Sequence, residues 1–389
     1  MIKVILAPDY DKARTYAEQH RVDATVEAEY GAKCAEGETI TLAHHGPRAD
    51  NSAPCNDPRA TQLKDNSTIL VSHLDLDALG GCMALMGTKP KDVDFWKAAE
   101  KMDVEGYHHI SELTPKLQDQ LNAFYATEGD MPRYQDVTDI TSEVQAKAEI
   151  VSAVLDEKHL NHSQLIEAGR VWASNLQAEA EKCLVTENEN GRAFLSNGAD
   201  CSAAYYSPRQ QKICPAIVIY NKKYNSITVG FYDGGSPECS AREIVQDLWG
   251  PEAGGRDGIA GSPRNWDKSP SEMEQEFFRA QRAVNERVQF MKDANAVERR
   301  LTVNLDDFEP TDSQGYSMDG VVRYRNRDFF VSIGMEGIGS YEHQAAMQVV
   351  QQLNEEHKKD RIEQIQQEMQ GLVDDLDRGV VNDDPKFGE

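Results

Sequence analysis

The segment Ser72–Gly81 constrains this chain most, because it changes from a strand-like to a helix-like pattern within ten residues. It follows the apolar run Ile69–Val71 and reads Ser-His-Leu-Asp-Leu-Asp-Ala-Leu-Gly-Gly. If the strand continues into it, His73, Asp75 and Asp77 point to one side at a period of two. The small residues that follow allow a helix to begin close by, where its N-terminus favours an anion.

The imidazole of His73 and the carboxylates of Asp75 and Asp77 form a ligand set suited to a divalent ion such as Mn²⁺ or Mg²⁺. An exposed polar loop that carries this pattern by chance is the alternative. Five of the ten histidines lie between residues 44 and 109, where even scatter would place fewer than two. This enrichment favours a histidine-containing site in the N-terminal part of the chain.

A second cluster follows the strand-like run Thr39–Leu42 and contains His44 and His45. Adjacent histidines cannot share one face of a strand, but at its end one can bind metal while the other faces a substrate phosphate. Arg48 and Asn51 are further hydrogen-bond donors to such a phosphate. A third cluster in this part of the chain is formed by Asp103, His108 and His109.

Charge and cysteine content limit the kind of protein. The 66 acidic and 41 basic residues give a formal net charge of −25, which argues against a protein that coats duplex DNA. A compact polyanion is a compatible ligand if bound metal or a local basic pocket supplies positive charge. The seven cysteines contain no C-x-x-C pair, and no apolar run approaches the roughly 20 residues that span a bilayer. We therefore expect a cytoplasmic protein with reduced thiols and no membrane partner.

The hydrophobic pattern predicts an α/β protein with four parts. Short strands in the first part end in acidic or histidine residues, as in parallel sheets that bind ligands at the carboxyl ends of their strands. A helical linker follows, then a smaller lobe with two strands, a helix and a glycine-rich segment, and finally an α+β extension with an acidic tail. The expected parts are residues 1–114, 115–190, 191–267 and 268–389.

Individual elements are predicted at several places. Strands are expected at Ile2–Ala7, Thr39–Leu42, Thr68–Ser72, Ala216–Tyr220 and Ser226–Tyr232, and near 301–305 and 321–333. Helices are expected at Asp94–Met102 and Ala241–Trp249 and, as two long elements, near 270–297 and 342–372.

The motifs resemble those of the DHH/DHHA1 phosphoesterase superfamily. The shared features are His73-x-Asp75-x-Asp77 after a strand, a His-His pair after another, and Gly250–Gly261, which is similar to the family's G-G-H-x-x-A-x-G substrate loop. Members of the family include single-strand exonucleases, short-oligonucleotide nucleases, cyclic-dinucleotide phosphodiesterases and manganese pyrophosphatases. The resemblance implies a DHH-like lobe with a parallel sheet, a helical linker and a DHHA1-like substrate lobe.

The resemblance also implies roles for single residues around two Mn²⁺ ions, with Mg²⁺ as the other compatible metal. His73 and Asp75 would hold one ion, and Asp77 with His44 the other. The further ligands would be Asp103 and a bridging aspartate, for which Asp9 is the candidate and Asp11 a competitor. His45 would contact the scissile phosphate. The rest of the substrate would lie against Gly254, Gly255, Arg256 and Arg264.

The chain departs from the family pattern in several places. Ala43 stands where the family has an aspartate before the His-His pair, Arg256 replaces a histidine, and Ile259 replaces an alanine. The order of the motifs also differs, because the His-His pair precedes His73. Either the lobe is permuted, or His108 and His109 are the true counterparts of the pair and carry its catalytic role.

We therefore expect a hydrolase that cleaves phosphodiester bonds of a small nucleotide, a cyclic dinucleotide or a short single-stranded oligonucleotide. Ala43 and Arg256 favour the alternative of a non-catalytic nucleotide-binding protein on the same scaffold. A third reading is an interaction protein that works through the two long helices, the second of which is also compatible with a homodimer. Tyr205 and Tyr206 either stack on a base or fill a core.

Overall fold

The computed structural model describes residues 2–31, 33–45, 48, 51–128, 134–235, 239–263, 266–311, 316–325, 327–335 and 339–377. The chain divides into two compact units. One consists of Met1–Thr186 with Arg192–Asn225, and the other of Glu187–Gly191 with Ser226–Glu389. The boundary after residue 225 falls inside the predicted part 191–267, and the division into four parts stays a prediction.

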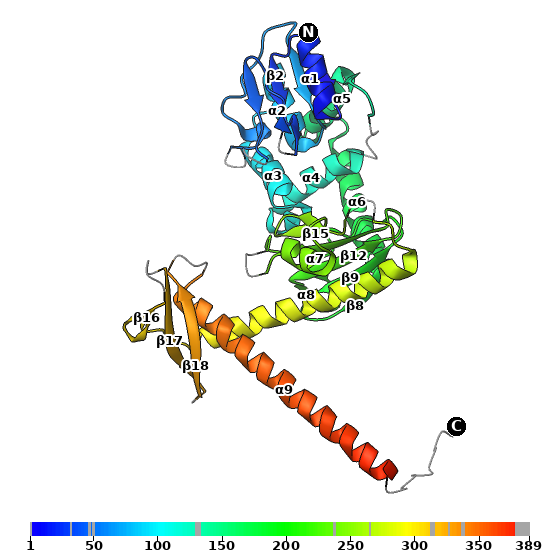
Figure 1. Ribbon diagram of the computed structural model, residues 1–389. Coiled ribbons are helices and arrows are strands. Elements are labelled where there is room, and N and C mark those ends of the chain that lie inside the picture. Colours follow the sequence, from blue (N-terminus) through cyan, green and yellow to red (C-terminus); the bar gives the residue numbers. More distant parts are fainter. Residues whose placement is uncertain are drawn as a thin grey trace, which may run out of the picture. The chain divides into compact units, whose positions relative to one another are not determined.

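The first unit is built on a five-stranded sheet in the order β5-β2-β6-β1-β7. In Figure 1, β2 of this sheet lies at the blue, N-terminal end of the ribbon, near α1 and α2. Four of these strands are parallel, and β7 runs antiparallel to β1. The strands are β1 (Lys3–Leu6), β2 (Ala24–Val26), β5 (Ile40–Leu42), β6 (Thr68–Val71) and β7 (Thr138–Asp139). This sheet confirms the predicted α/β class with parallel strands, and it places the carboxyl ends of β5, β2 and β6 side by side.

Helices connect and cover these strands because their apolar faces need burial. The helices of this unit are α1 (Tyr10–Gln19), α2 (Leu76–Met86), α3 (Val93–Val104), α4 (Pro115–Glu128), α5 (Thr141–Leu155) and α6 (His162–Lys182), with short 3₁₀ helices η2 (Pro54–Asn56) and η3 (Tyr107–Glu112). The core of the unit gathers side chains from the sheet and from α2, α3, α4 and α5, with Trp96, Phe95 and Phe124 among its largest buried members.

Two glycines of the Ser72–Gly81 segment determine how closely α2 packs. A Cβ at Gly80 would lie 2.5 Å from the Cβ of Cys55 and 2.6 Å from the ring of Trp96. A Cβ at Gly81 would lie 2.8 Å from the Cβ of Pro54. Any larger residue would therefore push η2 and α3 away from α2, and both carry groups that position the site described below.

The rest of the first unit contains short strands. A parallel pair is formed by β9 (Arg192–Ser196) and β12 (Ala216–Asn221), with β8 (Leu184–Glu187) beside β9. Two-residue strands pair as β3 (Glu29–Tyr30) with β4 (Lys33–Cys34), and β10 (Tyr206–Ser207) with β11 (Lys212–Ile213). The predicted strand at Ala216–Tyr220 is thus confirmed.

The second unit starts with β13 (Ser226–Phe231), which pairs with the hairpin of β14 (Gly254–Gly255) and β15 (Ile259–Gly261). Its helices are α7 (Ala241–Trp249), α8 (Pro270–Glu298) and α9 (Tyr341–Asp377), and α7 has the predicted bounds. A second sheet has the order β16-β17-β18, with β16 at Glu309–Pro310, β17 at Ser317–Tyr324 and β18 at Arg327–Gly334.

The strand expected near residues 301–305 is wrong. The chain is irregular from Leu301 to Asn304, and Leu305–Asp307 form the 3₁₀ helix η4. The alternating Leu301, Val303 and Leu305 resemble a strand, but they pack onto the core between α8, α9 and the second sheet. An irregular segment that is buried on one side can therefore show the same alternation of apolar and polar residues as a strand.

In the described part of the chain, no helix combines the length and apolar character needed to cross a bilayer.

Helix α9 covers the outer edge of β18 with a row of side-chain amides. Gln344 accepts a hydrogen bond from the Gly334 N–H at 2.8 Å and donates to its carbonyl at 3.2 Å. Gln348 pairs in the same way with the N–H and carbonyl of Ser332. Gln352, the third glutamine of the row, donates to the carbonyl of Phe330 at 2.6 Å. Four helical residues rise about 6 Å and two strand residues about 6.7 Å, so the two repeats match.

Replacing Gln344, Gln348 and Gln352 together by alanine should open this edge. We expect faster hydrogen exchange at the Ser332 and Gly334 amides and self-association at high concentration, because an uncovered edge strand pairs with other strands. Exchange mass spectrometry and light scattering measure both effects. The matched control is Gln351→Ala, one position away on the exposed side of α9. Unchanged protection at both amides in the triple variant would contradict this role.

Candidate metal centre

Glu27 occupies the centre of a cluster of acidic and histidine side chains at the carboxyl edge of the sheet. It follows β2 directly, and β2 lies between β5 and β6. The register pairs Val26 with Leu42 on one side and with Val71 on the other. The residues that continue these three strands therefore meet, and the side chain of Glu27 is fully buried among them.

The backbone of Glu27 is left-handed, with φ of 47°. Such a conformation costs a residue with a Cβ about 1–3 kcal/mol and persists only where the surroundings enforce it. Here the Glu27 N–H donates to the Leu42 carbonyl at 2.8 Å, and the Glu27 carbonyl accepts from the hydroxyl of Ser72. Both neighbouring strand ends thus fix the turn that sends this carboxylate into the cluster.

Three imidazoles surround the Glu27 carboxylate. Its Oε1 lies 2.6 Å from Nε2 of His44 and 3.5 Å from Nε2 of His45, and its Oε2 lies 2.8 Å from Nε2 of His73. The hydroxyl of Ser72 lies 2.8 Å from Nδ1 of His73 and holds the ring with Nε2 toward the cluster. The Glu27 carboxylate is therefore shared by histidines that follow β5 and β6.

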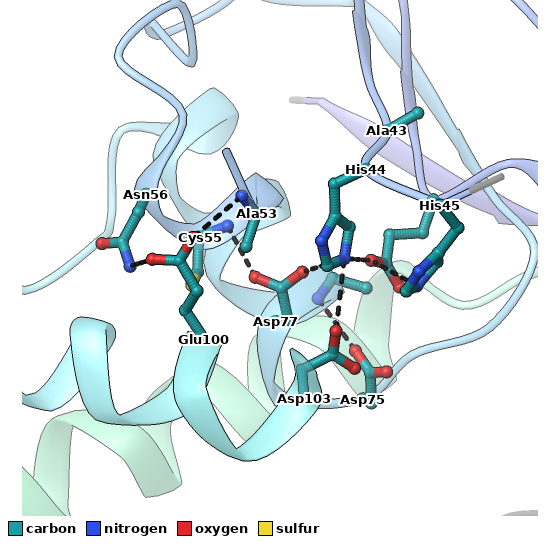
Figure 2. A network of polar contacts seen from close by, with 12 residues as sticks. Ala43, His44, His45, Ala53, Cys55, Asn56, Asp75, Asp77, Glu100 and Asp103 are labelled. Carbon is teal, nitrogen blue, oxygen red and sulfur yellow. Dashed lines mark hydrogen bonds and ion pairs between the residues drawn. The ribbon is translucent and has the colours of Figure 1, made fainter. Parts of the chain in front are cut away.

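Nε2 of His44 also faces two aspartates, as Figure 2 shows. Oδ2 of Asp77 and Oδ2 of Asp103 each lie 3.3 Å from this nitrogen. One ring nitrogen carries at most one proton and cannot satisfy three carboxylates. Oδ2 of Asp77, Oδ2 of Asp103 and Oε2 of Glu27 are buried and have no hydrogen bond of normal geometry in the described part of the chain. Converging buried oxygens of this kind fit a bound cation.

Asp75 and Asp77 come from the start of α2. Oδ1 of Asp75 caps the helix by accepting from the Ala78 N–H at 2.9 Å, and its Oδ2 lies 3.1 Å from Nε2 of His73. Oδ1 of Asp77 accepts from the Cys55 N–H at 2.8 Å, which leaves Oδ2 toward His44. Each carboxylate thus uses one oxygen for the fold and presents the other to the cluster.

Glu100 on α3 fixes the loop that supports Asp77 (Figure 2). Its carboxylate accepts from the Ala53 N–H at 3.2 Å and from the side-chain amide of Asn56 at 2.7 Å. This holds η2, and with it the Cys55 N–H, against the helix that also carries Asp103. The spacing of three residues between Glu100 and Asp103 places the support and the cluster on adjacent turns.

The cluster contains two groups of ligand atoms that share Glu27. Glu27, His44, His45 and Asp103 have ligand atoms within 4.8 Å of one another, and so do Glu27, His73 and Asp75. Imidazole nitrogen combined with carboxylate oxygen suits Mn²⁺ and related divalent ions. The four carboxylates, counting Asp77, balance the charge of two dications. The residues therefore fit two divalent ions with Glu27 between them.

Charge interactions shift the pKa values of these groups. Burial opposes charge on His44 and His73, but the facing carboxylates outweigh it and raise the pKa of His44 to about 12 and that of His73 to about 11. Burial favours the neutral form of Glu27, yet the three imidazoles hold its pKa below the ordinary value. For Asp77, burial dominates and raises the pKa to about 6.

Asp9 lies outside both ligand groups. It caps α1, where Oδ1 accepts from the Lys12 N–H at 2.9 Å and Oδ2 from the Lys12 ammonium at 2.7 Å. Asp9 follows β1, which is one strand further from β2 than β6 is. The structure therefore brings Glu27, and not Asp9, next to the other candidate ligands, and the bridging role of Asp9 stays a prediction.

His108 and His109 belong to η3 and lie outside both groups that contain Glu27. The ring of His108 stacks between His109 and the buried Tyr205, at centroid distances of 4.2 and 4.7 Å. His109 forms a third group with Glu105 and Glu112, but the ammonium of Lys101 lies within 2.9 Å of both glutamates. The Lys101 ammonium thus already pairs with both carboxylates of that group.

The predicted substrate contacts are distributed over both units. The Arg48 guanidinium donates to Glu36 at 2.5 Å, and the Asn51 amide donates to the Ala43 carbonyl at 2.9 Å and so supports the His44 backbone. Gly254, Gly255 and Arg256 form the β14–β15 hairpin of the second unit, and Arg264 lies outside the described residues. Tyr205 is buried, whereas Tyr206 is exposed.

The sequence matches no protein-family model and no curated protein. Among solved structures, the chain is similar to a pGpG-specific phosphodiesterase, PggH, from Vibrio cholerae, with a TM-score of 0.33 and 10% identity over 72% of this chain and 99% of that one. An uncharacterized protein from Helicobacter pylori G27 matches with a TM-score of 0.20 and 10% identity over 73% of this chain and 83% of that one. At these scores neither likeness carries a conclusion about activity.

Glu27→Gln should remove the shared ligand while keeping its size. We expect the affinity for Mn²⁺ to fall at least about 100-fold, because even outer partners of metal ligands are worth 10- to 100-fold. Titration calorimetry on the full chain measures it. Glu29→Gln is the matched control, since Glu29 accepts from the His45 N–H and a glutamine oxygen still does so. Equal Mn²⁺ affinity in Glu27→Gln and the wild-type protein would contradict the central role of Glu27.

Metal binding should release protons. His44 and His73 carry raised pKa values in the metal-free protein and are protonated at neutral pH, whereas an imidazole ligand must be neutral. Each histidine that becomes a ligand loses one proton, so the apparent affinity for Mn²⁺ should increase as the pH rises from 6 to 8. Calorimetry in buffers of different ionisation enthalpy counts the protons. Affinity that is constant over this range would argue against these ligands.

Proposed function

We propose that this chain is a metal-dependent phosphoesterase that hydrolyses phosphodiester bonds of a small nucleotide, a cyclic dinucleotide or a short single-stranded oligonucleotide. The observation that carries the proposal is the pair of ligand groups sharing Glu27. A metal-dependent phosphoesterase needs several carboxylates and histidines at one point, and the ends of three parallel strands supply them here. The motif resemblance to the DHH/DHHA1 superfamily agrees with this chemistry.

In this proposal, His73 and Asp75 would hold one Mn²⁺, and His44, Asp77 and Asp103 would hold the other, with Glu27 available to both ligand groups. When bound, paired divalent ions would supply a nucleophilic water at neutral pH and stabilise charge on the phosphate oxygens. The His-His pair of the family corresponds to His44 and His45, which requires the permuted order of motifs.

His45 is the catalytic candidate among the histidines. Its side chain is 29% exposed, whereas that of His44 is 4% exposed, so His45 is the member of the pair that a substrate can reach. The contact with the Glu27 carboxylate raises the pKa of His45 and so favours the protonated form of the ring. A protonated imidazole beside a phosphodiester can bind a phosphate oxygen or give its proton to the departing oxygen. His108 and His109 stay alternatives for this role.

Gly254, Gly255, Arg256 and Arg264 remain the predicted contacts for the rest of the substrate. The exposed glycines of this hairpin allow an anion to approach the backbone closely, and the Arg256 guanidinium can pair with a phosphate as the family's histidine does. Arg48 and Asn51 stay candidates for substrate contact, and each also bonds a neighbouring part of the chain.

A second candidate is a nucleotide-binding protein without turnover. Ala43 is the residue that favours it, because a carboxylate at this position would orient the adjacent histidine. Its place beside His44 is fully buried, and the Ala43 carbonyl is held by Asn51. Tight nucleotide binding in Mn²⁺ with no product would support this candidate over the enzyme.

The substitution Asp75→Asn removes the charge of the proposed metal ligand but keeps a side chain that can cap α2. Asparagine also caps helices, so we expect a folded protein whose Mn²⁺-dependent hydrolysis is reduced by at least about 100-fold, because a metal ligand has been lost. The assay is a screen of mono-, di- and cyclic nucleotides with Mn²⁺.

The matched control is Asp92→Asn, because Asp92 caps α3 through the Phe95 N–H at 3.0 Å in the same way. It should retain wild-type turnover. Equal activity in Asp75→Asn and Asp92→Asn would reject the assignment of Asp75 as a ligand.

A further inference from the structure

A cavity of about 280 Å³ opens directly beside the carboxylates of the metal centre. Its lining includes the acidic residues Asp75, Asp77 and Asp103 and the aromatic residues Tyr107, Tyr125 and Trp172. All of these residues belong to the first unit. The volume lies near the lower end of small-molecule sites, roughly 300–1,000 Å³, and so suits a ligand group about the size of one nucleoside.

The three aromatic rings form one packed wall. Tyr107 meets Tyr125 and Trp172 edge to face, with centroids 5.5 Å apart in both pairs, and Tyr125 lies 6.0 Å from Trp172 at a smaller angle of 35°. The hydroxyl of Tyr107 donates to the side chain of Asn122 at 2.7 Å and fixes its ring. The rings are half-buried, so part of their surface is available to a ligand.

Gly169 explains how Trp172 reaches this wall. It is buried on α6, and a Cβ there would lie 2.4 Å from the backbone nitrogen of Ala123 on α4. The two helices therefore approach to backbone contact one turn before Trp172, which brings its indole next to Tyr125. The aromatic wall is thus part of the helix packing and is in place before any ligand binds.

The charges around the cavity limit which part of a ligand can lie against the carboxylates and which part against the aromatic rings. Its charged lining groups in the described residues are Asp75, Asp77, Asp103 and Asp200, all acidic. A phosphate can approach the first three only when cations neutralise them. The aromatic wall suits a flat, uncharged group, and nucleobases stack on such rings with roughly 1–3 kcal/mol per base.

We propose that this cavity is the subsite for one nucleobase of the substrate, stacked on the wall of Tyr107, Tyr125 and Trp172 beside the phosphate-binding metal centre. This proposal deepens the proposed function, because it requires the hydrolysed ester to belong to a nucleotide. A pyrophosphate or a sugar phosphate would leave the aromatic wall unused. The site assigned here differs from the region of Tyr205 and Tyr206 that the sequence indicates.

The test compares a nucleoside 5′-monophosphate with ribose 5-phosphate, which lacks only the base. Binding to the full chain is measured by calorimetry with Mn²⁺ present. The wild-type protein should bind the best of the four common monophosphates roughly 5- to 150-fold more tightly than ribose 5-phosphate. Trp172→Leu should lose most of this ratio without changing the affinity for ribose 5-phosphate, and Trp172→Phe should keep most of it.

Trp249→Leu is the matched control, since it removes the same side chain from α7, outside the cavity lining. Tyr125→Leu gives an independent test should Trp172→Leu fail to fold, and it should reduce the same ratio. Equal binding of both ligands to the wild-type protein, or an equal loss for both in the cavity variants, would overturn the subsite. If the protein hydrolyses a nucleotide but binds the monophosphate no more tightly than ribose 5-phosphate, the subsite alone is rejected. If it binds the monophosphate more tightly but hydrolyses no nucleotide, only the enzymatic function is rejected.

Discussion

The carboxylate of Glu27 is the interaction on which the site depends. It reaches three imidazoles from two neighbouring strands, and it does so from a left-handed backbone that both strand ends hold in place. The charge of Glu27 helps to raise the pKa values of both His44 and His73, so its removal would lower both. The parallel order of β5, β2 and β6 is what brings these groups together, so the chemistry of the cluster follows directly from the topology of the sheet.

The sequence pattern was sufficient to predict those residues of the site that follow long or strongly patterned segments. His73, Asp75 and Asp77 follow an apolar strand and lie before small residues, and the structure brings all three into the cluster with His44 and Asp103. Glu27 was missed because β2 has only three residues, which are too few to indicate a strand by themselves. The alternating Val22, Ala24 and Val26 is the signal that could have indicated a strand there.

The ambiguity over Asp9 has a similar cause. An aspartate just after a strand is equally consistent with a metal ligand and with a helix N-cap, and Lys12 three residues later completes the cap. Strand order, which the sequence does not reveal, decides between them. The aromatic wall was also unpredictable, because Tyr107, Tyr125 and Trp172 are far apart in the chain and meet only through the crossing of α4 and α6 that Gly169 permits.

The row of glutamines on α9 places an unusual limit on how that helix can vary. Single substitutions elsewhere on its exposed surface leave the edge of β18 covered, since each amide pairs with its own strand residue. An insertion or deletion between Gln344 and Gln352 would instead rotate the following glutamines by about 100° and carry them off the strand. This stretch of helix should therefore tolerate changes of residue type far better than changes of length.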